Sequence, residues 1–331
     1  MSENLRGVQT LVTGAGGFIA SHLVEALIND GAKVRAFVRY NSRGDPGLLK
    51  LLTKNIYDHL EIIAGDLRDL TAVHSAMRDI NLVFHLGALI AIPYSYLHPA
   101  EVVETNVMGT LNILLAGREQ NVDRIVHTST SEVYGTALNV PIRETHPLQG
   151  QSPYSASKIG ADKLVESFYK SYDLPVVTLR PFNTYGPRQS ARAVIPSIII
   201  QALTQEVIYL GNLDARRDLT FVEDTIDGFR KVAQIKDIEG ETFNLGTGKE
   251  VRIDELAQVI FNQIGKKVEI RVDKSRLRPD KSEVQRLLAD NSLAKERLNW
   301  APSVNLVEGI NRTIRWIEEN QHLYNENQYQ I

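Results

Sequence analysis

The chain has 331 residues, 43% of them hydrophobic, and its 37 basic and 40 acidic side chains give a formal net charge of −3. That length and apolar content suffice for a large core in one domain or two joined lobes, and the charge offers no basic field for nucleic acid or an anionic membrane. The absence of cysteine excludes disulfides, a thiolate nucleophile and cysteine-based metal sites.

The first half of the chain alternates short apolar segments with segments of helical periodicity. The predicted strands cover 9–13, 33–38, 60–64, 81–86, 124–128 and 175–180, and the predicted helices cover 18–29, 71–77, 102–119 and about 153–170. Ser152 before Pro153 is typical of an N-cap followed by a proline at the first helical position. Strands that alternate with helices predict an α/β fold, a doubly wound, Rossmann-type parallel sheet with helices on both faces.

The character of the sequence changes after Pro181. Residues 183–219 are rich in proline, glycine, arginine and glutamine and show weak periodicity, whereas 220–232 favour a helix and 242–245 a strand that rejoins the sheet edge. The predicted organisation is a dinucleotide-binding domain (1–182, with 219–246 returning to it) and a smaller C-terminal α+β substrate lobe (183–218 and 247–331). We expect the active-site cleft between the two.

From the sequence we expect no segment that directs the chain to a membrane or to secretion. No apolar run reaches the ~18 residues that a membrane helix needs, and the first 20 residues lack the charged and apolar regions of a signal peptide. The absence of cysteine fits a reducing compartment. We therefore expect a cytoplasmic protein that acts on small molecules, with no nucleic acid, membrane or metal partner.

A glycine-rich loop joins the first predicted strand to the first predicted helix. In that position backbone N–H groups and the helix dipole can face a pyrophosphate. A plain tight turn is the alternative, but the strand–loop–helix context favours a dinucleotide. The predicted cofactor-binding residues of this loop are Gly14, Gly16, Gly17, Phe18 and Ile19.

Two further segments bear on the cofactor. Asp66 is predicted to accept a hydrogen bond from the adenine amino group, with Leu67 lining the ring; the alternative is an ordinary turn or N-cap aspartate. NAD sites usually place an acid at the end of the second strand, where this sequence has Arg39, Ser42 and Arg43. Guanidinium groups match phosphate oxygens, so we predict NADP. The alternative is NAD, with Arg39 stacked on the adenine.

The candidate catalytic groups follow the fifth predicted strand and begin the next helix. Tyr154 and Lys158 are four residues apart and share one helix face, where the ammonium can lower the phenol pKa. A phenolate can then take the proton of a substrate hydroxyl as hydride leaves the same carbon. Thr130, Ser131 and Glu132 come at the carboxyl edge of the sheet, where a carboxylate can remove a proton next to the new ketone. The alternative for Glu132 is an exposed loop acid.

Polar and cationic side chains after the sixth predicted strand indicate an anionic substrate. Asn183 and Arg188 are candidate ligands for a diphosphate, and Arg217 and Arg278 are further cations suited to bidentate phosphate contact. Each arginine taken singly could equally be a surface residue.

These motifs resemble those of the extended short-chain dehydrogenase/reductase family of nucleotide-sugar enzymes, through almost the whole chain. Within that family, Thr130-Ser-Glu-Val-Tyr-Gly135 is similar to the 4,6-dehydratases and the UDP-glucuronate decarboxylases. The runs 88–96, 149–153 and 188–196 resemble dehydratases of the legionaminic acid pathway, which act on nucleotide-linked N-acetylglucosamine. That similarity adds Tyr94 and Val194 to the expected substrate-binding residues.

The resemblance implies a reaction and an assembly. Tyr154 takes the proton from O4 while the C4 hydride goes to NAD(P)⁺, Glu132 removes the C5 proton, water leaves from C6, and the hydride returns to C6. The product is a 4-keto-6-deoxy sugar, and the oxidised cofactor is regenerated, which implies a tightly bound NADP or NAD that acts as a catalyst and not as a co-substrate. Family habit further implies a homodimer packed through helices at about 100–119 and 153–170. Whether the nucleotide is UDP or GDP is left open.

One position departs from many dTDP-glucose dehydratases, which carry an aspartate before the glutamate. Here that residue is Ser131, whose pKa is too high to protonate a leaving hydroxyl, so Glu132 or a water must do so. GDP-mannose dehydratases have the same Ser-Glu pair. The decarboxylases share it too and are the main alternative, followed by a 4-epimerase, which needs no glutamate there, and by a non-catalytic dinucleotide-binding module.

Overall fold

A seven-stranded parallel sheet organises the molecule, of which this computed structural model describes residues 5–324. The strand order is β11-β6-β5-β4-β1-β2-β3. The strands are β1 (Gln9–Thr13), β2 (Lys33–Arg39), β3 (Leu60–Gly65), β4 (Leu82–His85), β5 (Arg124–Thr128), β6 (Val176–Pro181) and β11 (Thr242–Leu245). The predicted Rossmann-type fold is confirmed, and residues 242–245 do return to pair with β6 at the sheet edge.

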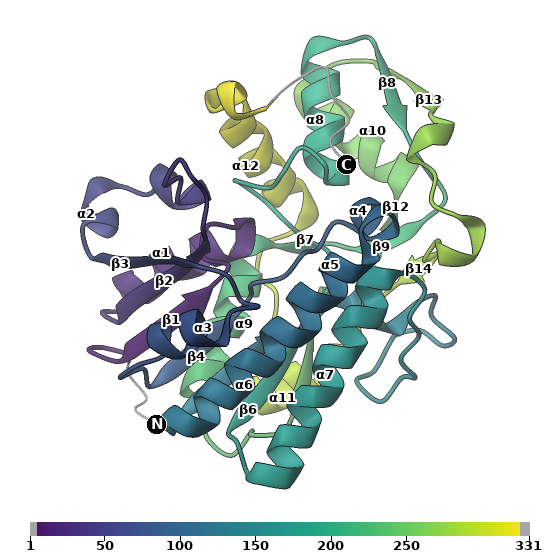
Figure 1. The fold of residues 1–331 in the computed structure, drawn as a ribbon. Helices are drawn as coiled ribbons and strands as arrows, with labels where there is room; N and C mark the ends of the chain where they lie inside the picture. The colour runs from purple at the N-terminus through teal and green to yellow at the C-terminus, as the bar shows by residue number, and fades with distance from the viewer. Residues whose placement is uncertain (1–4, 325–331) are drawn as a thin grey trace.

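Helices cover both faces of this sheet (Figure 1). One face carries α3 (Leu70–Ala76), α6 (Gly109–Gln120) and α7 (Pro153–Tyr172); the other carries α1 (Phe18–Asn29), α9 (Val222–Gln234) and α11 (Ser292–Leu298). Neighbouring residues of a strand point to opposite faces of the sheet. Leu11 packs in the core beneath α3, α6 and α7, and Val12 packs in the core on the other face. Strands buried on both faces read as continuous apolar runs, which is why they were predictable.

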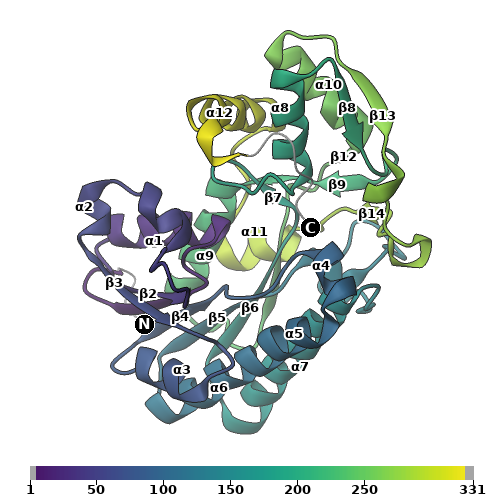
Figure 2. The same ribbon diagram turned by 45° about the horizontal axis from the view of Figure 1, so that its top comes forward.

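A second, smaller lobe lies at the carboxyl edge of the sheet (Figure 2). Its helices are α8 (Val194–Thr204), α10 (Ile253–Ile264) and α12 (Leu306–Glu319). Its strands pair as β8 (Val207–Leu210) with β13 (Glu269–Val272), as β12 (Glu250–Arg252)–β9 (Arg216–Asp218)–β14 (Arg286–Leu287), and as β7 (Thr184–Tyr185) with β10 (Thr220–Phe221).

Two elements differ from the sequence prediction. Helix α8 was not foreseen, because it is buried on most of its surface and so lacks amphipathic periodicity. Helix α11 packs on β11 and α9, although the predicted boundaries placed it in the C-terminal lobe. The shorter helical segments are η1 (Gly47–Leu51), α2 (Lys54–Tyr57), α4 (Ile92–Leu97), α5 (Pro99–Val103), η3 (Ser131–Tyr134), η4 (Lys274–Arg276), η5 (Asp280–Ser282) and η6 (Gln321–Leu323).

The helix predicted over 102–119 is continuous in space but changes pitch. A π-helical turn (Glu104–Met108) separates α5 from α6. Within it, the Asn106 amide oxygen accepts from the Leu89 N–H (2.7 Å), and its amide nitrogen donates to the Leu89 carbonyl (2.9 Å). The turn therefore lets Asn106 fix the backbone that follows β4.

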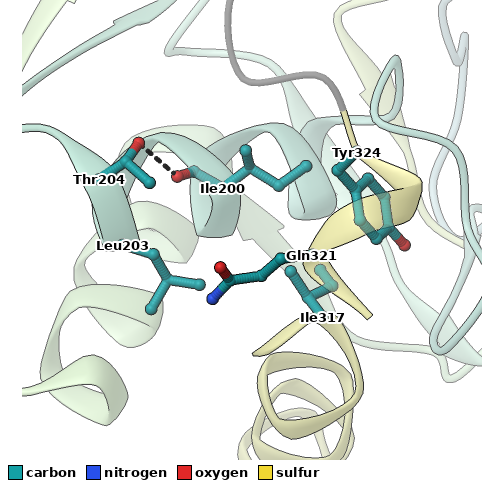
Figure 3. Close-up of a pocket in the computed structure, with 6 residues that line it drawn as sticks. All are labelled: Ile200, Leu203, Thr204, Ile317, Gln321 and Tyr324. Atoms are coloured by element: carbon teal, nitrogen blue, oxygen red, sulfur yellow. Dashed lines mark hydrogen bonds between the residues drawn. The ribbon is translucent and has the colours of Figure 1, made fainter. Parts of the chain in front are cut away.

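A small hollow between α8 and α12 is a packing feature. Figure 3 shows its lining, which comprises Ile200, Leu203, Thr204, Ile317, Gln321 and Tyr324. Its volume of about 10 Å³ is that of a single water. Over residues 5–324, no helix combines the length and the apolar character that crossing a membrane requires.

Candidate active site

Helix α7 presents the Tyr154/Lys158 pair to the carboxyl end of β5. The helix starts in a capping box, in which the Ser155 N–H donates to the Ser152 hydroxyl (3.0 Å) and the Ser152 N–H to that of Ser155 (2.9 Å). Pro153 occupies the first helical position, as predicted. This cap fixes where the helix begins, and so where Tyr154, one residue later, points.

The structure brings Tyr154, Lys158 and Thr130 together in a buried cluster. The Thr130 side chain hydrogen-bonds the Tyr154 phenol, and the Lys158 ammonium donates to the Thr128 carbonyl at 2.7 Å. Tyr154 is 7% exposed and Lys158 is 4% exposed. A hydroxyl bound between Thr130 and Tyr154 would have both a hydrogen-bond partner and a proton acceptor.

Burial controls the ionisation of this pair. It raises the pKa of the Tyr154 phenol, against the effect of the Thr130 hydrogen bond, and nearby carboxylates raise it further. It also lowers the pKa of Lys158 to about 8, an effect that Asp162 opposes. The simple expectation of a lowered Tyr154 pKa is thus wrong for this structure, because desolvation and the nearby carboxylates outweigh the hydrogen bond with Thr130.

Glu132 belongs to the site rather than to an exposed loop. It lies in η3, whose N-cap Thr130 accepts the Glu132 N–H at 3.2 Å. Its side chain is 13% exposed, and its Oε2 lies 3.8 Å from Nη1 of Arg278. Ser131 instead is buried and does not line the adjoining cavity. The carboxylate therefore faces the space beside Tyr154, and the Ser131 hydroxyl turns into the protein.

A cavity of about 410 Å³ opens next to Glu132, between α8, β9 and the loop that precedes β14. Arginines dominate its charge. Four of them, Arg192, Arg217, Arg276 and Arg278, face two carboxylates, Glu132 and Glu283; Asn183 and Val194 also line it. Such a surplus of guanidinium groups suits a diphosphate. Of the residues that line the cavity, Asn183, Val194, Arg217 and Arg278 were predicted from the sequence to bind the substrate. Arg192 and Arg276 were not predicted, because they belong to no recognisable motif.

Arg217 is the most deeply placed of these cations. It is 7% exposed, burial lowers its pKa, and its Nη2 donates to Oε1 of Glu283 at 3.4 Å. A buried guanidinium that lies near the carboxylates of Glu132 and Glu283, with the hydrogen bond to Glu283 as long as 3.4 Å, is well placed to bind an anion.

We expect Arg217→Gln to weaken UDP or GDP binding about tenfold or more, since a charged hydrogen bond contributes about 1.5–3 kcal/mol. Isothermal titration calorimetry measures it. Arg286→Gln is the matched control, because Arg286 lies on the adjacent strand outside the cavity and pairs with Glu250 at 2.8 Å. An unchanged affinity in Arg217→Gln would remove Arg217 from the site.

Two predicted substrate residues are not brought to the cavity. Arg188 donates to Oε2 of Glu25 on α1 at 2.7 Å, in a left-handed backbone conformation with φ of 68°. Tyr94 donates to Oε2 of Glu101 at 2.5 Å. Neither residue is among those that line the cavity. Arg188 instead ties the loop after β7 to helix α1.

The glycine loop has the geometry of a dinucleotide cradle. Gly14 has φ of +66°, and a Cβ there would lie 2.7 Å from the Gly87 Cα; a Cβ at Gly16 would lie 2.6 Å from the Pro46 carbonyl oxygen. Helix α1 begins at Phe18, followed by Ile19, with no side-chain cap from Gly17 and no acid in its first turn. Its first amides are thus available to an anion, so these residues fit a pyrophosphate.

Two of the residues proposed for the adenosine half, Asp66 and Arg39, are paired with other side chains. The Asp66 carboxylate accepts from Nη2 of Arg68 at 2.7 Å, and that hydrogen bond lowers the pKa of Asp66. Leu67 is buried. Arg39 and Ser42 are exposed, and Nη2 of Arg39 pairs with Oε1 of Glu101 at 3.2 Å.

Comparison with known proteins places this geometry in one family. Residues 11–313 match the family described as GDP-mannose 4,6 dehydratase. The UDP-glucose 4-epimerase of Mycolicibacterium smegmatis is 33% identical over 316 residues, which cover 93% of this chain and 98% of that protein.

Two solved structures share the fold across nearly the whole length. DesIV, a dTDP-glucose 4,6-dehydratase from Streptomyces venezuelae with NAD and TYD bound, has a TM-score of 0.87 at 28% identity and covers 96% of this chain and 99% of its own. The UDP-N-acetylglucosamine 4-epimerase of Methanobrevibacter ruminantium has a TM-score of 0.85 at 30% identity, with 95% and 99% covered. The chain therefore belongs to the extended short-chain dehydrogenase/reductase family of nucleotide-sugar dehydratases and epimerases.

Proposed function

We propose that this protein is a 4,6-dehydratase of a nucleotide-linked N-acetylglucosamine, with UDP or GDP as the nucleotide. The observation that carries the proposal is the shielded Glu132 carboxylate between the Tyr154 cluster and the arginine-lined cavity. A 4-epimerase needs only the tyrosine and lysine, whereas elimination needs a base at C5 as well.

The chain's residues divide the reaction between two ends of the site. The arginines of the cavity hold the diphosphate, which sets the sugar against Tyr154. A bound nicotinamide cofactor supplies a hydride acceptor at C4 and a hydride donor at C6. Tyr154 takes the O4 proton during oxidation, with Thr130 donating to the same oxygen and Lys158 providing the positive charge that favours the phenolate.

Glu132 acts at C5 and C6 once C4 is a ketone. It removes the C5 proton, which the ketone has acidified, and the C6 hydroxyl leaves as water after gaining one proton. Ser131 is buried, so the proton comes from Glu132 itself or from a water beside it. A hydride returned to C6 by the bound cofactor and a proton from solvent at C5 would complete the 4-keto-6-deoxy sugar, so the net change is the loss of one water.

The proposed cofactor is NADP, with NAD as the alternative. Arg39 supports NADP because it ends β2, where the ribose phosphate would lie. Its pairing with Glu101 means that a 2′-phosphate would have to replace a carboxylate partner.

We expect Arg39→Ser to raise the Kd for NADP⁺ about tenfold and to change the Kd for NAD⁺ by less than about threefold, since the guanidinium has a phosphate to bind in NADP⁺ alone. Fluorescence titration of both dinucleotides measures the ratio. Lys54→Ser, at the exposed start of α2, gives a matched loss of one positive charge outside the residues predicted to bind the phosphate. A parallel loss of both affinities would favour NAD with Arg39 stacked on adenine.

The division into two lobes, with α11 counted with the dinucleotide-binding domain, a cytoplasmic location and a homodimer are further parts of the proposal. The exposed side chains of Leu97, Val103 and Met108 support the homodimer, because they lie along the α4–α6 segment beside α7. Such a row of apolar groups is typical of a surface that a second copy covers.

The test is product analysis in D₂O with UDP-N-acetylglucosamine, GDP-N-acetylglucosamine and UDP-glucuronate, each supplied separately. Loss of water, with deuterium at C5, is expected for one of the first two and identifies the nucleotide. Loss of CO₂ from the glucuronate alone would make the protein a decarboxylase. Inversion at C4 without loss of water would make it an epimerase.

A further inference from the structure

Helix α7 carries a third buried polar residue on the face of Tyr154 and Lys158. Asp162 follows at the same spacing of four residues, so the three side chains are stacked along one side of the helix. Asp162 is 6% exposed. No step of the proposed reaction uses it, and an ionised carboxylate is retained in a protein interior only where partners compensate its charge.

These three residues meet successive residues of β5 and the turn after it. The Asp162 carboxylate accepts from Nε2 of His127 (3.0 Å) and from the hydroxyl of Ser129 (2.8 Å). Between those contacts, Lys158 holds the Thr128 carbonyl, and beyond them Tyr154 meets Thr130. Each residue from 127 to 130 is thereby attached to α7.

Asp162 also reaches the far side of the turn that carries Glu132. Its Oδ2 accepts from Nη2 of Arg180 at 3.0 Å, and Nη1 of Arg180 donates to the Tyr134 hydroxyl at 2.9 Å. Tyr134 is the last residue of η3. The carboxylate therefore constrains the segment on both sides of Glu132, directly at 127 and 129 and through Arg180 at 134.

We propose that Asp162 is a positioning residue, which holds Glu132 and Thr130 in register with Tyr154 and supplies the counter-charge of the buried Lys158 ammonium. The geometry rests on the structure alone; only the kinetic readout rests on the proposed function. Asp162 touches no reacting atom in the proposed reaction, so it acts only through the residues that it holds in place.

Charge supports this assignment. Burial alone would raise the pKa of Asp162, but the His127 hydrogen bond and the charges of Arg180 and Lys158 bring it down to about 2. It is thus ionised throughout the working range. The charged or titratable groups that face Lys158 and Tyr154 are Asp162 on α7, His127 and Glu132 on the β5–η3 segment, and His85 on β4. Arg180 on β6 faces Asp162 and His127.

Removing the negative charge of Asp162 should lower the pKa of both Lys158 and Tyr154. Asp162 favours the Lys158 ammonium and disfavours the Tyr154 phenolate. In Asp162→Asn the ammonium is therefore lost at a lower pH, and the phenolate forms at a lower pH. The pH–rate profile shifts as a whole to lower pH, on the order of one unit, and kcat falls about tenfold or more with KM little changed.

The experiment compares Asp162→Asn with Glu166→Gln, which removes a carboxylate one helical turn further on. Glu166 pairs with exposed Lys163 and Lys170 and is expected to leave kcat and the profile unchanged. The Lys158 ionisation is followed separately by NMR of protein labelled with ¹³C at lysine Cε, assigned with Lys158→Arg. That readout needs no substrate, so it stands even if wild-type protein converts none of the sugars and the proposed function fails.

A displaced Lys158 titration with a displaced profile in Asp162→Asn supports the proposal. An unmoved titration, or a loss of activity equal at every pH, overturns the counter-charge role. If Asp162→Asn does not fold, Tyr134→Phe tests the positioning role without changing charge. A lower kcat with an unshifted profile supports it, and wild-type kcat overturns it.

Discussion

Replacement of Glu132 by glutamine is expected to stop elimination while C4 oxidation continues. The substitution preserves shape and removes the base, and a positioned general base contributes about 10²–10⁴-fold in rate. The 4-keto sugar that still bears its C6 hydroxyl should accumulate together with reduced cofactor. Stopped-flow absorbance of the reduced nicotinamide measures the oxidation, and product NMR measures the loss of water.

Glu283→Gln is the matched comparison, because Glu283 is the other carboxylate of the cavity and lies beside Arg217 rather than beside Tyr154. It is expected to change KM and to leave the ratio of ketone to dehydrated product as in the wild type. If Glu132→Gln converts its substrate as fast as the wild type, Glu132 does not remove a proton from C5. The 4-epimerase would then be the better description.

The sheet was predictable from sequence because its signal is local. Each strand is a short apolar run, and the covering helices α1, α3, α6, α7 and α9 have apolar residues at helical spacing, so neighbouring residues suffice to identify them. Helix α11 was not predicted. The start of α7 was equally clear from Ser152 and Pro153. Helix α8 was missed for the opposite reason, since burial on most of its sides removes the periodicity that prediction relies on.

The candidate catalytic residues were predictable in part, because Tyr154 and Lys158 lie on one turn of helix and Glu132 follows a strand end. Their surroundings were not, since those depend on contacts between distant parts of the chain. Arg188 pairs with Glu25, 163 residues earlier, and no local pattern signals that pairing. The role of Asp162 likewise emerges only when β5 is laid against α7.

The pKa of Tyr154 differs most clearly between what the sequence predicts and what the structure shows. Spacing alone places a lysine near a tyrosine and suggests a lowered phenol pKa. Burial instead raises the pKa of Tyr154, and the depth of that burial is known only from the folded structure. The ionisation of the tyrosine therefore depends on its burial, on its hydrogen bond to Thr130 and on the nearby carboxylates as much as on its own chemistry.

Replacement of Tyr154 by phenylalanine is accordingly expected to abolish every step, because oxidation at C4 precedes the elimination. The rate of cofactor reduction should fall about 10³-fold, within the range of a lost general base. Dinucleotide affinity should change by less than about threefold, because only the hydroxyl is removed and Lys158 stays in place. Single-turnover absorbance and fluorescence titration measure the two effects on the same protein.

Thr130→Val provides the graded comparison, because it removes the hydrogen bond to the phenol and keeps the phenol itself. That bond opposes the burial effect, so its loss raises the Tyr154 pKa further, and the rise of activity with pH should move to higher pH. Asp162→Asn is expected to move the same limb to lower pH. Opposite shifts in these two variants, with no activity in Tyr154→Phe, would identify Tyr154 as the group that titrates; shifts in one direction would point to another base.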